Sequence, residues 1–315
     1  MSNLGQRIAT ASVAIPLIVL ICMAGGIWFF LFIALASAAA LHEFYALAKA
    51  KGARPNVALG LASGFMVNSA FFYPKLSMFC VELLHDMGWA VPFPTQAQLL
   101  VIVLLVSVLS MAVAELFGNR GPAIAGVTAT VAGVLYVSLF FGTFIGLREI
   151  FVQGDFPAYR WFPDAAGSGA DIIWPDVYRW GGYTVISVLS TIWICDTAAY
   201  HAGLAIGKHK LFPRVSPNKT REGAAAGFIF AIGSALAAKY LVLDYLSAGD
   251  AVIIGLIVGT LGQVGDLFES LLKRDAGVKD SSNLLPGHGG VLDRFDSLLF
   301  VAPAVYIYID FIILS

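Results

Sequence analysis

Long apolar runs, repeated along almost the whole chain, are the sequence feature that most restricts how it can fold. The chain has 315 residues, of which 59% are hydrophobic and only 12% are charged, and its mean hydropathy is +0.83. A bilayer core of about 30 Å requires roughly 20 apolar residues per helix, because each backbone polar group there needs an internal partner. The sequence therefore predicts an all-α polytopic membrane protein.

Nine segments are long and apolar enough to be expected as transmembrane helices. They cover residues 8–24, 27–48, 56–73, 98–117, 123–147, 183–204, 223–243, 248–271 and 297–314. Only Gly25 and Gly26 separate the first two segments, which predicts either a tight hairpin or one long broken helix. The segment 149–182 is rich in Trp, Pro and Gly, and we expect it at the membrane interface or in a small cap.

Basic residues are distributed unevenly between the two sides of the predicted bundle. Of the 19 lysines and arginines, 14 lie at the N-terminus and in the loops after predicted helices two, four, six and eight. The positive-inside rule places these loops in the cytoplasm. The formal net charge of −1 gives no reason to expect nucleic acid as a partner.

Two carboxylates, Asp196 and Asp266, lie inside apolar runs. A buried carboxylate in a membrane is costly unless a cation, a metal ion or water compensates for it. On a helix, Ser270 and Lys273 follow Asp266 at intervals of four and seven residues and therefore share its face. The alternative for each acid is a hydrogen-bonded structural carboxylate, whereas the pattern favours a polar stripe that ends on the cytoplasmic side.

The chain from residue 270 to 296 combines groups that phosphoryl chemistry uses. Three basic residues can neutralise phosphate oxygens: Lys273, Arg274 and Lys279. The Gly-rich sequence at 286–290 lets backbone N–H groups approach an anion. Asp293 and Asp296 are three residues apart where the last predicted helix begins, and such oxygen ligands suit Mg²⁺. The alternative is an ordinary charged loop whose acids stabilise the helix dipole.

The segment 270–296 resembles, along its whole length, the signature of the phosphatidate cytidylyltransferase (CDP-diacylglycerol synthase) family. In this chain the pattern is S-x-L-K-R-x4-K-D-x-S-x2-L-P-x-H-G-G-V-x-D-R-F-D. A second similarity covers about 196–227, where the sequences DTAAY, from Asp196, and SPNKTREG, from Ser216, look like the family's upstream nucleotide-site motifs. The first half of the chain resembles the family only in its hydropathy.

The resemblance implies an enzyme that transfers CMP from CTP to phosphatidic acid and so gives CDP-diacylglycerol and pyrophosphate in phospholipid biosynthesis. The attacking phosphate oxygen is already an anion near neutral pH, so alignment and charge neutralisation should dominate catalysis. The resemblance also implies Mg²⁺, leaves room for a second cation and suggests a homodimer. We expect the protein in the cell inner membrane, as a multi-pass protein whose active site faces the cytoplasm.

The residues expected in this site form three groups. The metal ligands are Asp196, Asp266, Asp293 and Asp296, with Asp196 joining directly or through water. The catalytic group contains Asp266, Lys273, His288, Asp293 and Arg294. The substrate-binding group contains Ser216, Lys219, Thr220, Glu222, Ser270, Arg274, Lys279 and Asp280. His288 either hydrogen-bonds phosphate or only braces its loop.

We expect two parts in the chain, with 1–182 holding the first five helices and an outside loop, and 183–315 holding the last four helices and the catalytic site. Two other functions remain open. An ion-coupled transporter would explain Asp196 and Asp266, but not the charges and glycines concentrated in two loops. An enzyme that uses CTP on a polyprenol or another lipid would need similar loops. A CDP-alcohol phosphotransferase is not expected, because its D-G-x2-A-R-x8-G-x3-D-x3-D pattern is absent.

Overall fold

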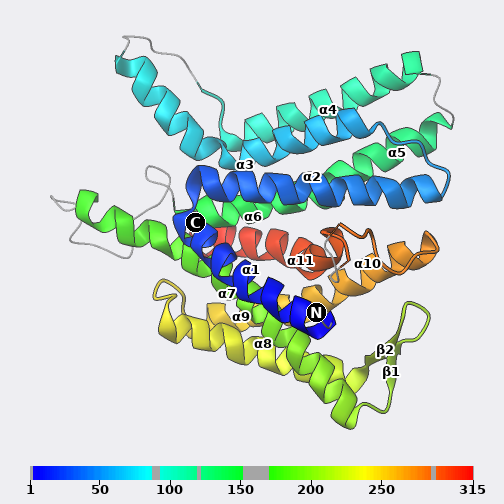
Figure 1. The fold of residues 1–315 in the computed structure, drawn as a ribbon. Coiled ribbons are helices and arrows are strands. Elements are labelled where there is room, and N and C mark those ends of the chain that lie inside the picture. The colour runs from blue at the N-terminus through cyan, green and yellow to red at the C-terminus, as the bar shows by residue number, and fades with distance from the viewer. Residues whose placement is uncertain (1–2, 87–92, 119–121, 152–169, 285–288, 315) are drawn as a thin grey trace.

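The computed structural model describes residues 3–86, 93–118, 122–151, 170–284 and 289–314, and these residues are almost entirely helical (Figure 1). The helices are α1 (Asn3–Ala24), α2 (Gly26–Ala50), α3 (Val57–Asp86), α4 (Gln96–Gly118), α5 (Ala123–Gly133), α6 (Leu139–Glu149), α7 (Ala170–Ile206), α8 (Arg221–Leu241), α9 (Ala248–Ile257), α10 (Gln263–Asp275) and α11 (Leu292–Tyr308). The π-helical turns Val134–Ser138 and Val258–Gly262 join α5 to α6 and α9 to α10, and Ile309–Ile313 extends α11.

Eight helical segments among the described residues are long and apolar enough to cross a bilayer, which confirms the predicted class. They are Gly26–Ala50, Val57–Ser77, Gln96–Gly118, Ala123–Glu149, Val177–Ile206, Arg221–Leu241, Ala248–Asp275 and Leu292–Ile313. These segments correspond to eight of the nine predicted spans, those after the first. The expected first span, 8–24, lies in α1, and its part within the described side chains, Ala14–Ala24, is an apolar helix.

The basic loops lie at one end of the bundle. Figure 1 shows the α2–α3 and α7–α8 connections, the C-terminal end of α4, the N-terminal end of α5 and the C-terminal end of α10 on the same side. The α7–α8 connection holds a small antiparallel hairpin, β1 (Lys210–Phe212) and β2 (Ser216–Thr220). The structure therefore gathers the segments in which the sequence concentrates charge, and we call this side the polar end.

Helix α6 lies at the centre of the bundle, and all its residues from Phe141 to Glu149 are buried. In contrast, α8 buries only the small residues Gly223, Gly227, Ala231 and Ala235, which recur every four residues along one face. A Cβ atom at Gly227 would lie 2.9 Å from the carbonyl oxygen of Cys195 in α7. Such small-residue stripes let membrane helices approach closely, so α7 and α8 form a tight pair.

The turn between α1 and α2 is held by two charged residues at the end of α6. Gly25 and Gly26 both have positive φ angles, 60° and 56°, so the chain breaks sharply into two separate helices. Arg148 donates hydrogen bonds to the carbonyls of Cys22 (2.6 Å) and Met23 (3.0 Å), which are left without partners where α1 ends. Glu149 accepts the first N–H of α2, from Gly26, at 2.7 Å.

Candidate functional site

Three aspartates from three helices interact with one lysine at the polar end. Lys219 of β2 donates to Asp266 of α10, with 2.5 Å between Nζ and Oδ2. Asp196 of α7 and Asp296 of α11 interact electrostatically with both Asp266 and Lys219. We call these four residues the Lys219 cluster. Ser270 Oγ lies 3.4 Å from Asp266 Oδ1, one helical turn further along α10.

Close backbone packing brings the helices of this cluster together. Gly265, next to Asp266, packs against the backbone of Asp296, because a Cβ atom at that position would lie only 2.5 Å from the Asp296 carbonyl oxygen. Gly227 packs against Cys195 in the same way, next to Asp196. The glycines thus act as packing positions that let three carboxylates approach one another.

The hairpin that carries Lys219 is fixed at both ends. Thr220 caps α8 by accepting the backbone N–H of Gly223 at 3.2 Å. Glu222, in the first turn of α8, accepts backbone N–H groups of Lys208 (3.1 Å) and His209 (3.2 Å), and lies 2.6 Å from the His209 ring. The structure therefore gives Thr220 and Glu222 structural roles that hold Lys219 in place.

A second ionic cluster, which we call the Lys273 cluster, lies on α10 and α11. Lys273 Nζ is 2.6 Å from Asp293 Oδ1 and 2.5 Å from Glu269 Oε2. Glu269 is fully buried, and this ion pair compensates its charge although neither of its oxygens has a hydrogen bond of good geometry. Glu269 is not among the residues predicted for the site, although its position four residues before Lys273 on a helix is a signal for an ion pair.

Asp293 is engaged by its own loop as well as by Lys273. Its Oδ2 accepts the backbone N–H of Gly290 (2.7 Å), the backbone N–H of Ser281 (2.9 Å) and the Ser281 hydroxyl (2.9 Å). The predicted metal ligands therefore divide into two sets: Asp196, Asp266 and Asp296 come together, whereas Asp293 belongs to the Lys273 cluster. Residues three apart on a helix differ by about 60° in direction, which is enough to give them different neighbours.

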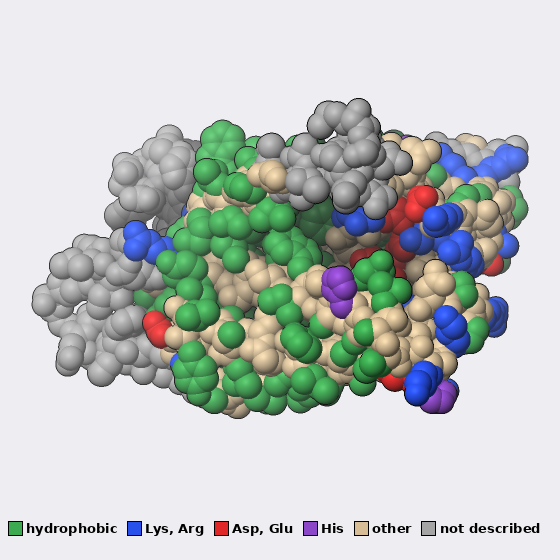
Figure 2. Space-filling view, turned by 60° about the horizontal axis from the view of Figure 1, so that its bottom comes forward, with side chains coloured by type: hydrophobic (Ala, Val, Ile, Leu, Met, Phe, Trp, Pro, Cys, Tyr) green, Lys and Arg blue, Asp and Glu red, His purple; other side chains and the backbone are tan. Residues whose placement is uncertain are grey.

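The other predicted residues lie around these clusters. Ser216 begins β2 and pairs with Phe212. Four charged residues are exposed at the polar end: Arg274, Lys279, Asp280 and Arg294. Figure 2 shows acidic side chains set in a hollow at one end of the molecule, with lysines and arginines around them. The remaining predicted residue, His288, lies outside the described residues.

The described residues contain no group of three or more His, Cys, Asp or Glu side chains arranged to hold a metal ion. The Lys219 cluster nevertheless has three carboxylates and one ammonium, which is an excess of negative charge when all are ionised. Carboxylate oxygens are the ligands that Mg²⁺ prefers. The donor chemistry therefore fits a hard divalent cation, although the acids are not already assembled as a complete shell.

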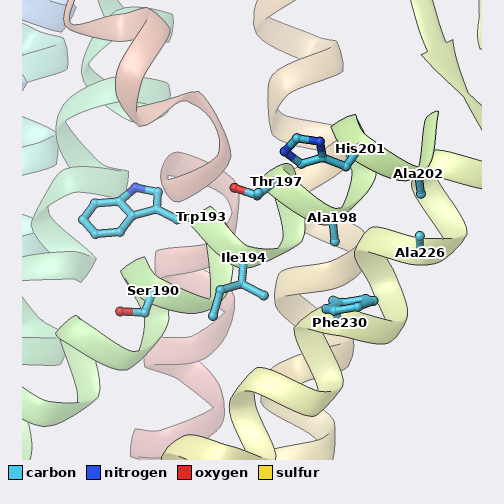
Figure 3. Close-up of a pocket in the computed structure, with 9 residues that line it drawn as sticks. All are labelled: Ser190, Trp193, Ile194, Thr197, Ala198, His201, Ala202, Ala226 and Phe230. Atoms are coloured by element: carbon cyan, nitrogen blue, oxygen red, sulfur yellow. The ribbon is translucent and has the colours of Figure 1, made fainter. Parts of the chain in front are cut away.

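A mainly apolar cavity of about 680 Å³ opens between α7 and α8 (Figure 3). It is lined by Ser190, Trp193, Ile194, Thr197, Ala198, His201, Ala202, Ala226 and Phe230. Thr197 and His201 are polar residues of its wall, and Thr197 directly follows Asp196. The wall of the cavity therefore includes the residue that follows Asp196 on α7.

Several curated proteins are similar to part of this chain. The phosphatidate cytidylyltransferase of Bacillus subtilis (strain 168) is 49% identical over 115 residues, which cover 36% of this chain and 43% of that protein. The phosphatidate cytidylyltransferases of Staphylococcus saprophyticus and Staphylococcus aureus (strain COL) are each 45% identical over 127 residues, or 40% of this chain and 49% of theirs. These matches span less than half the length of each relative.

The similarity to a family as a whole is much more extensive. The model of the cytidylyltransferase family matches residues 5–312, so it includes both halves of the chain and every site residue discussed above. The match therefore extends well beyond the two motifs at 196–227 and 270–296. The chain belongs to the cytidylyltransferase family.

Proposed function

We propose that the protein transfers the CMP group of CTP to phosphatidic acid and releases pyrophosphate. The observation that carries this proposal is the Lys219 cluster, in which Lys219 pairs with Asp266 and interacts electrostatically with carboxylates from two further membrane helices. Membership of the cytidylyltransferase family supports CTP as the donor. The relatives named phosphatidate cytidylyltransferase support phosphatidate as the acceptor.

In the proposed reaction, a phosphate oxygen of phosphatidate attacks the α-phosphorus of CTP. A new P–O bond forms there, and the bond from the α-phosphorus to the bridging oxygen breaks, so that its electron pair leaves with pyrophosphate. The nucleophile is already anionic, so the protein needs to align the two phosphates and reduce their repulsion. Lys219 and the exposed Arg274, Lys279 and Arg294 supply positive charge for this purpose.

Mg²⁺ belongs to this proposal, with Asp196, Asp266 and Asp296 as the residues that would hold it. When bound, it would neutralise charge that develops on the transferring phosphate and on the leaving pyrophosphate. Mg²⁺ is usually held by one or two carboxylates together with substrate phosphates and water. The three acids would therefore complete the coordination of Mg²⁺ only together with phosphate oxygens of the substrate. The same arrangement is compatible with a second cation.

We assign Asp293 a different role in the proposal. Both of its oxygens are hydrogen-bonded, to Lys273, Gly290 and Ser281. Its role would be to hold the loop that carries Lys279 against the start of α11. We further propose that the polar end faces the cytoplasm of the inner membrane, where CTP enters from water and the lipid arrives from the leaflet. A homodimer stays a prediction.

The direct test uses the purified protein in detergent or liposomes with CTP labelled at the α-phosphorus. With phosphatidate and Mg²⁺ we expect labelled lipid and release of pyrophosphate, and we expect neither product after addition of EDTA. Product formation with a polyprenyl phosphate but not with phosphatidate would contradict the proposed acceptor. Ion or solute flux in liposomes without consumption of CTP would indicate a transporter and refute the proposed reaction.

A further inference from the structure

A buried glutamate in the N-terminal half of the chain contacts the loop and helix that carry Asp293. Glu43 lies on α2 and is only 3% exposed. Like Asp196 and Asp266, it is an acid within an apolar run. The reaction proposed above uses no residue of α2, so this costly buried carboxylate requires its own explanation.

Glu43 accepts four hydrogen bonds from residues about 240 positions further along the chain. Oε1 accepts the Ser282 hydroxyl (2.6 Å) and the Val291 N–H (3.0 Å). Oε2 accepts the Ser281 hydroxyl (2.9 Å) and the Leu292 N–H (2.8 Å). Each oxygen therefore accepts one hydrogen bond from a serine before α11 and one from the backbone at the start of α11. A single carboxylate thus connects Ser281 and Ser282 to the first turn of that helix.

The same carboxylate caps α11. No side chain of the residue that precedes α11 accepts a hydrogen bond from its first turn. The N–H groups of Val291 and Leu292, which have no partner within the helix, point instead to Glu43. The positive end of the helix dipole compensates the buried charge of Glu43. Capping residues are normally adjacent to the helix in sequence, whereas this one comes from another helix.

Glu43 is connected to the Lys273 cluster through Ser281. The Ser281 hydroxyl lies 2.9 Å from Glu43 Oε2 and 2.9 Å from Asp293 Oδ2, and the Ser281 backbone N–H donates to Asp293. Gly290 lies between the two carboxylates, because a Cβ atom there would be 2.5 Å from Glu43 Oε2. The position of Asp293, and with it that of Lys273, thus depends on where Glu43 holds the loop.

Helix α2 is tightly packed in the bundle, which restricts the movement of Glu43. Phe29, Ile33 and Tyr45 on α2 are completely or almost completely buried in the core of the bundle. The hydroxyl of Tyr45, two residues from Glu43, donates to the carbonyl oxygen of Thr130 at 2.9 Å. A carboxylate on this helix has little freedom to follow a loop that moves.

We propose that Glu43 is a positioning residue of the site. It holds Ser281 and Ser282 against the first turn of α11, and thereby fixes Asp293, Lys273 and the loop that carries Lys279. The effect on catalysis rests on the function proposed above, whereas the effect on the loop does not. The two parts can therefore be tested separately.

The most informative substitution is Glu43→Gln, which keeps the size of the side chain. One of its two polar atoms becomes an NH₂ group and faces the N–H of Val291 or Leu292, so a donor meets a donor. Glu43→Asp keeps the charge but shortens the reach. The matched control is Glu149→Gln, since Glu149 is also buried, at 4% exposure, and also accepts hydrogen bonds, from Gly26 and Tyr178, beside the α1–α2 turn.

The first measurement is limited proteolysis of the folded protein with trypsin. Lys279 is exposed and lies in the segment that Glu43 holds. When opening is faster than cleavage, the cleavage rate follows the population of the opened loop. We expect Glu43→Gln to accelerate cleavage after Lys279 several-fold, and we expect the Glu149→Gln rate to match the wild type. Unchanged cleavage in Glu43→Gln, or equal acceleration in both variants, would overturn the proposal.

The second measurement is the CTP- and phosphatidate-dependent activity. We expect Glu43→Gln to lower kcat/KM by about tenfold to a hundredfold, the range found when residues that orient a site are changed. Glu43→Asp should recover part of the loss, whereas Glu149→Gln should retain its activity if it remains folded. Normal activity in Glu43→Gln would refute the catalytic part. A wild type without activity, combined with faster cleavage of Glu43→Gln, would refute the proposed reaction and leave the positioning role intact.

Discussion

The two lysines of the site differ in how firmly they are held. The side chain of Lys219 is 29% exposed and contacts Asp266, whereas that of Lys273 is 12% exposed and lies between Glu269 and Asp293. An incoming phosphate can therefore reach Lys219 and exchange with Asp266 as its partner. Lys273 is better suited to compensating buried acids than to binding a ligand that must come and go.

Replacing Lys219 by methionine should reduce activity much more than stability. Loss of one group that stabilises developing charge typically lowers kcat by about 10²- to 10³-fold. The direct partner of Lys219, Asp266, is 32% exposed, so water can solvate this carboxylate after the substitution. Steady-state kinetics with CTP, together with thermal unfolding, would measure both effects. Lys210→Met, on the same hairpin and exposed, is the control. Equal kinetics for the two variants would show that Lys219 does not act on substrate.

Replacing Lys273 by methionine should mainly destabilise the protein. It leaves Glu269, which is fully buried, and Asp293 without their cation, and breaking a buried ion pair typically costs about 3–5 kcal/mol. The Tm of the detergent-solubilised protein should fall clearly, and the double variant Lys273→Met/Glu269→Gln should recover part of the loss. A Tm equal to that of the wild type would mean that these buried charges are compensated in another way.

Among the structural elements, the α1–α2 turn shows that tertiary contacts can decide where one helix ends and the next begins. Hydropathy alone allows either a hairpin or one long broken helix here. Arg148 and Glu149 supply partners for the last carbonyls of α1 and the first N–H of α2. Tyr178 adds a hydroxyl that donates to Glu149 at 2.8 Å. Two helices, α6 and α7, therefore hold a turn of two glycines, and α1 does not continue into α2.

Gly25→Ala should destabilise the protein more than Gly52→Ala. Both glycines have positive φ, 60° and 85°, so both substitutions introduce backbone strain of roughly 1–2 kcal/mol. A Cβ atom at Gly25 would also overlap the Arg148 guanidinium and the Tyr178 hydroxyl, whereas nothing lies within 4 Å at Gly52. Thermal unfolding of the two variants measures the difference. If Gly52→Ala had the lower Tm, the packing at Gly25 would not be what restricts this turn.

At the scale of the whole molecule, the site combines residues from both halves of the chain. Helices α7, α10 and α11 and the β1–β2 hairpin bring the Lys219 cluster together, while α2 from the other half anchors the loop beside it. The N-terminal half thus contacts the proposed site through Glu43. The division of the chain at 182/183 stays a prediction.

Eight spans predict opposite sides for the β1–β2 hairpin and the α8–α9 connection, since one membrane helix separates them. In a variant with Cys80→Ser, a cysteine replacing the exposed Lys210 should react with an impermeant maleimide only when the cytoplasmic face is accessible. A cysteine replacing the exposed Ala248 should react in intact spheroplasts. Reaction of both residues from the same side would contradict α8 as a span, and the reverse pattern would contradict the proposed orientation.

Much of the proposed site can be predicted from the sequence, because its charged residues are concentrated in short segments. The acids within apolar runs and the segment 270–296 by themselves indicate Asp196, Asp266, Asp296 and several of the basic residues. The same signal, an acid in an apolar run, also marks Glu43, but nothing in its own segment shows what it contacts. Its partners are about 240 residues away, and only the packing of α2 beside α11 brings them together.

The sequence by itself determined the membrane class, eight of the nine expected spans and the polar end, because helix formation in a bilayer depends on local hydropathy and needs no distant partner. The tertiary structure decided which acids meet. It separated Asp293 from Asp296, because neighbouring positions on one helix face different helices, and it ended α1 at Gly25 through Arg148 and Glu149. Contacts of this kind depend on the directions of side chains between packed helices, and local sequence does not contain that information.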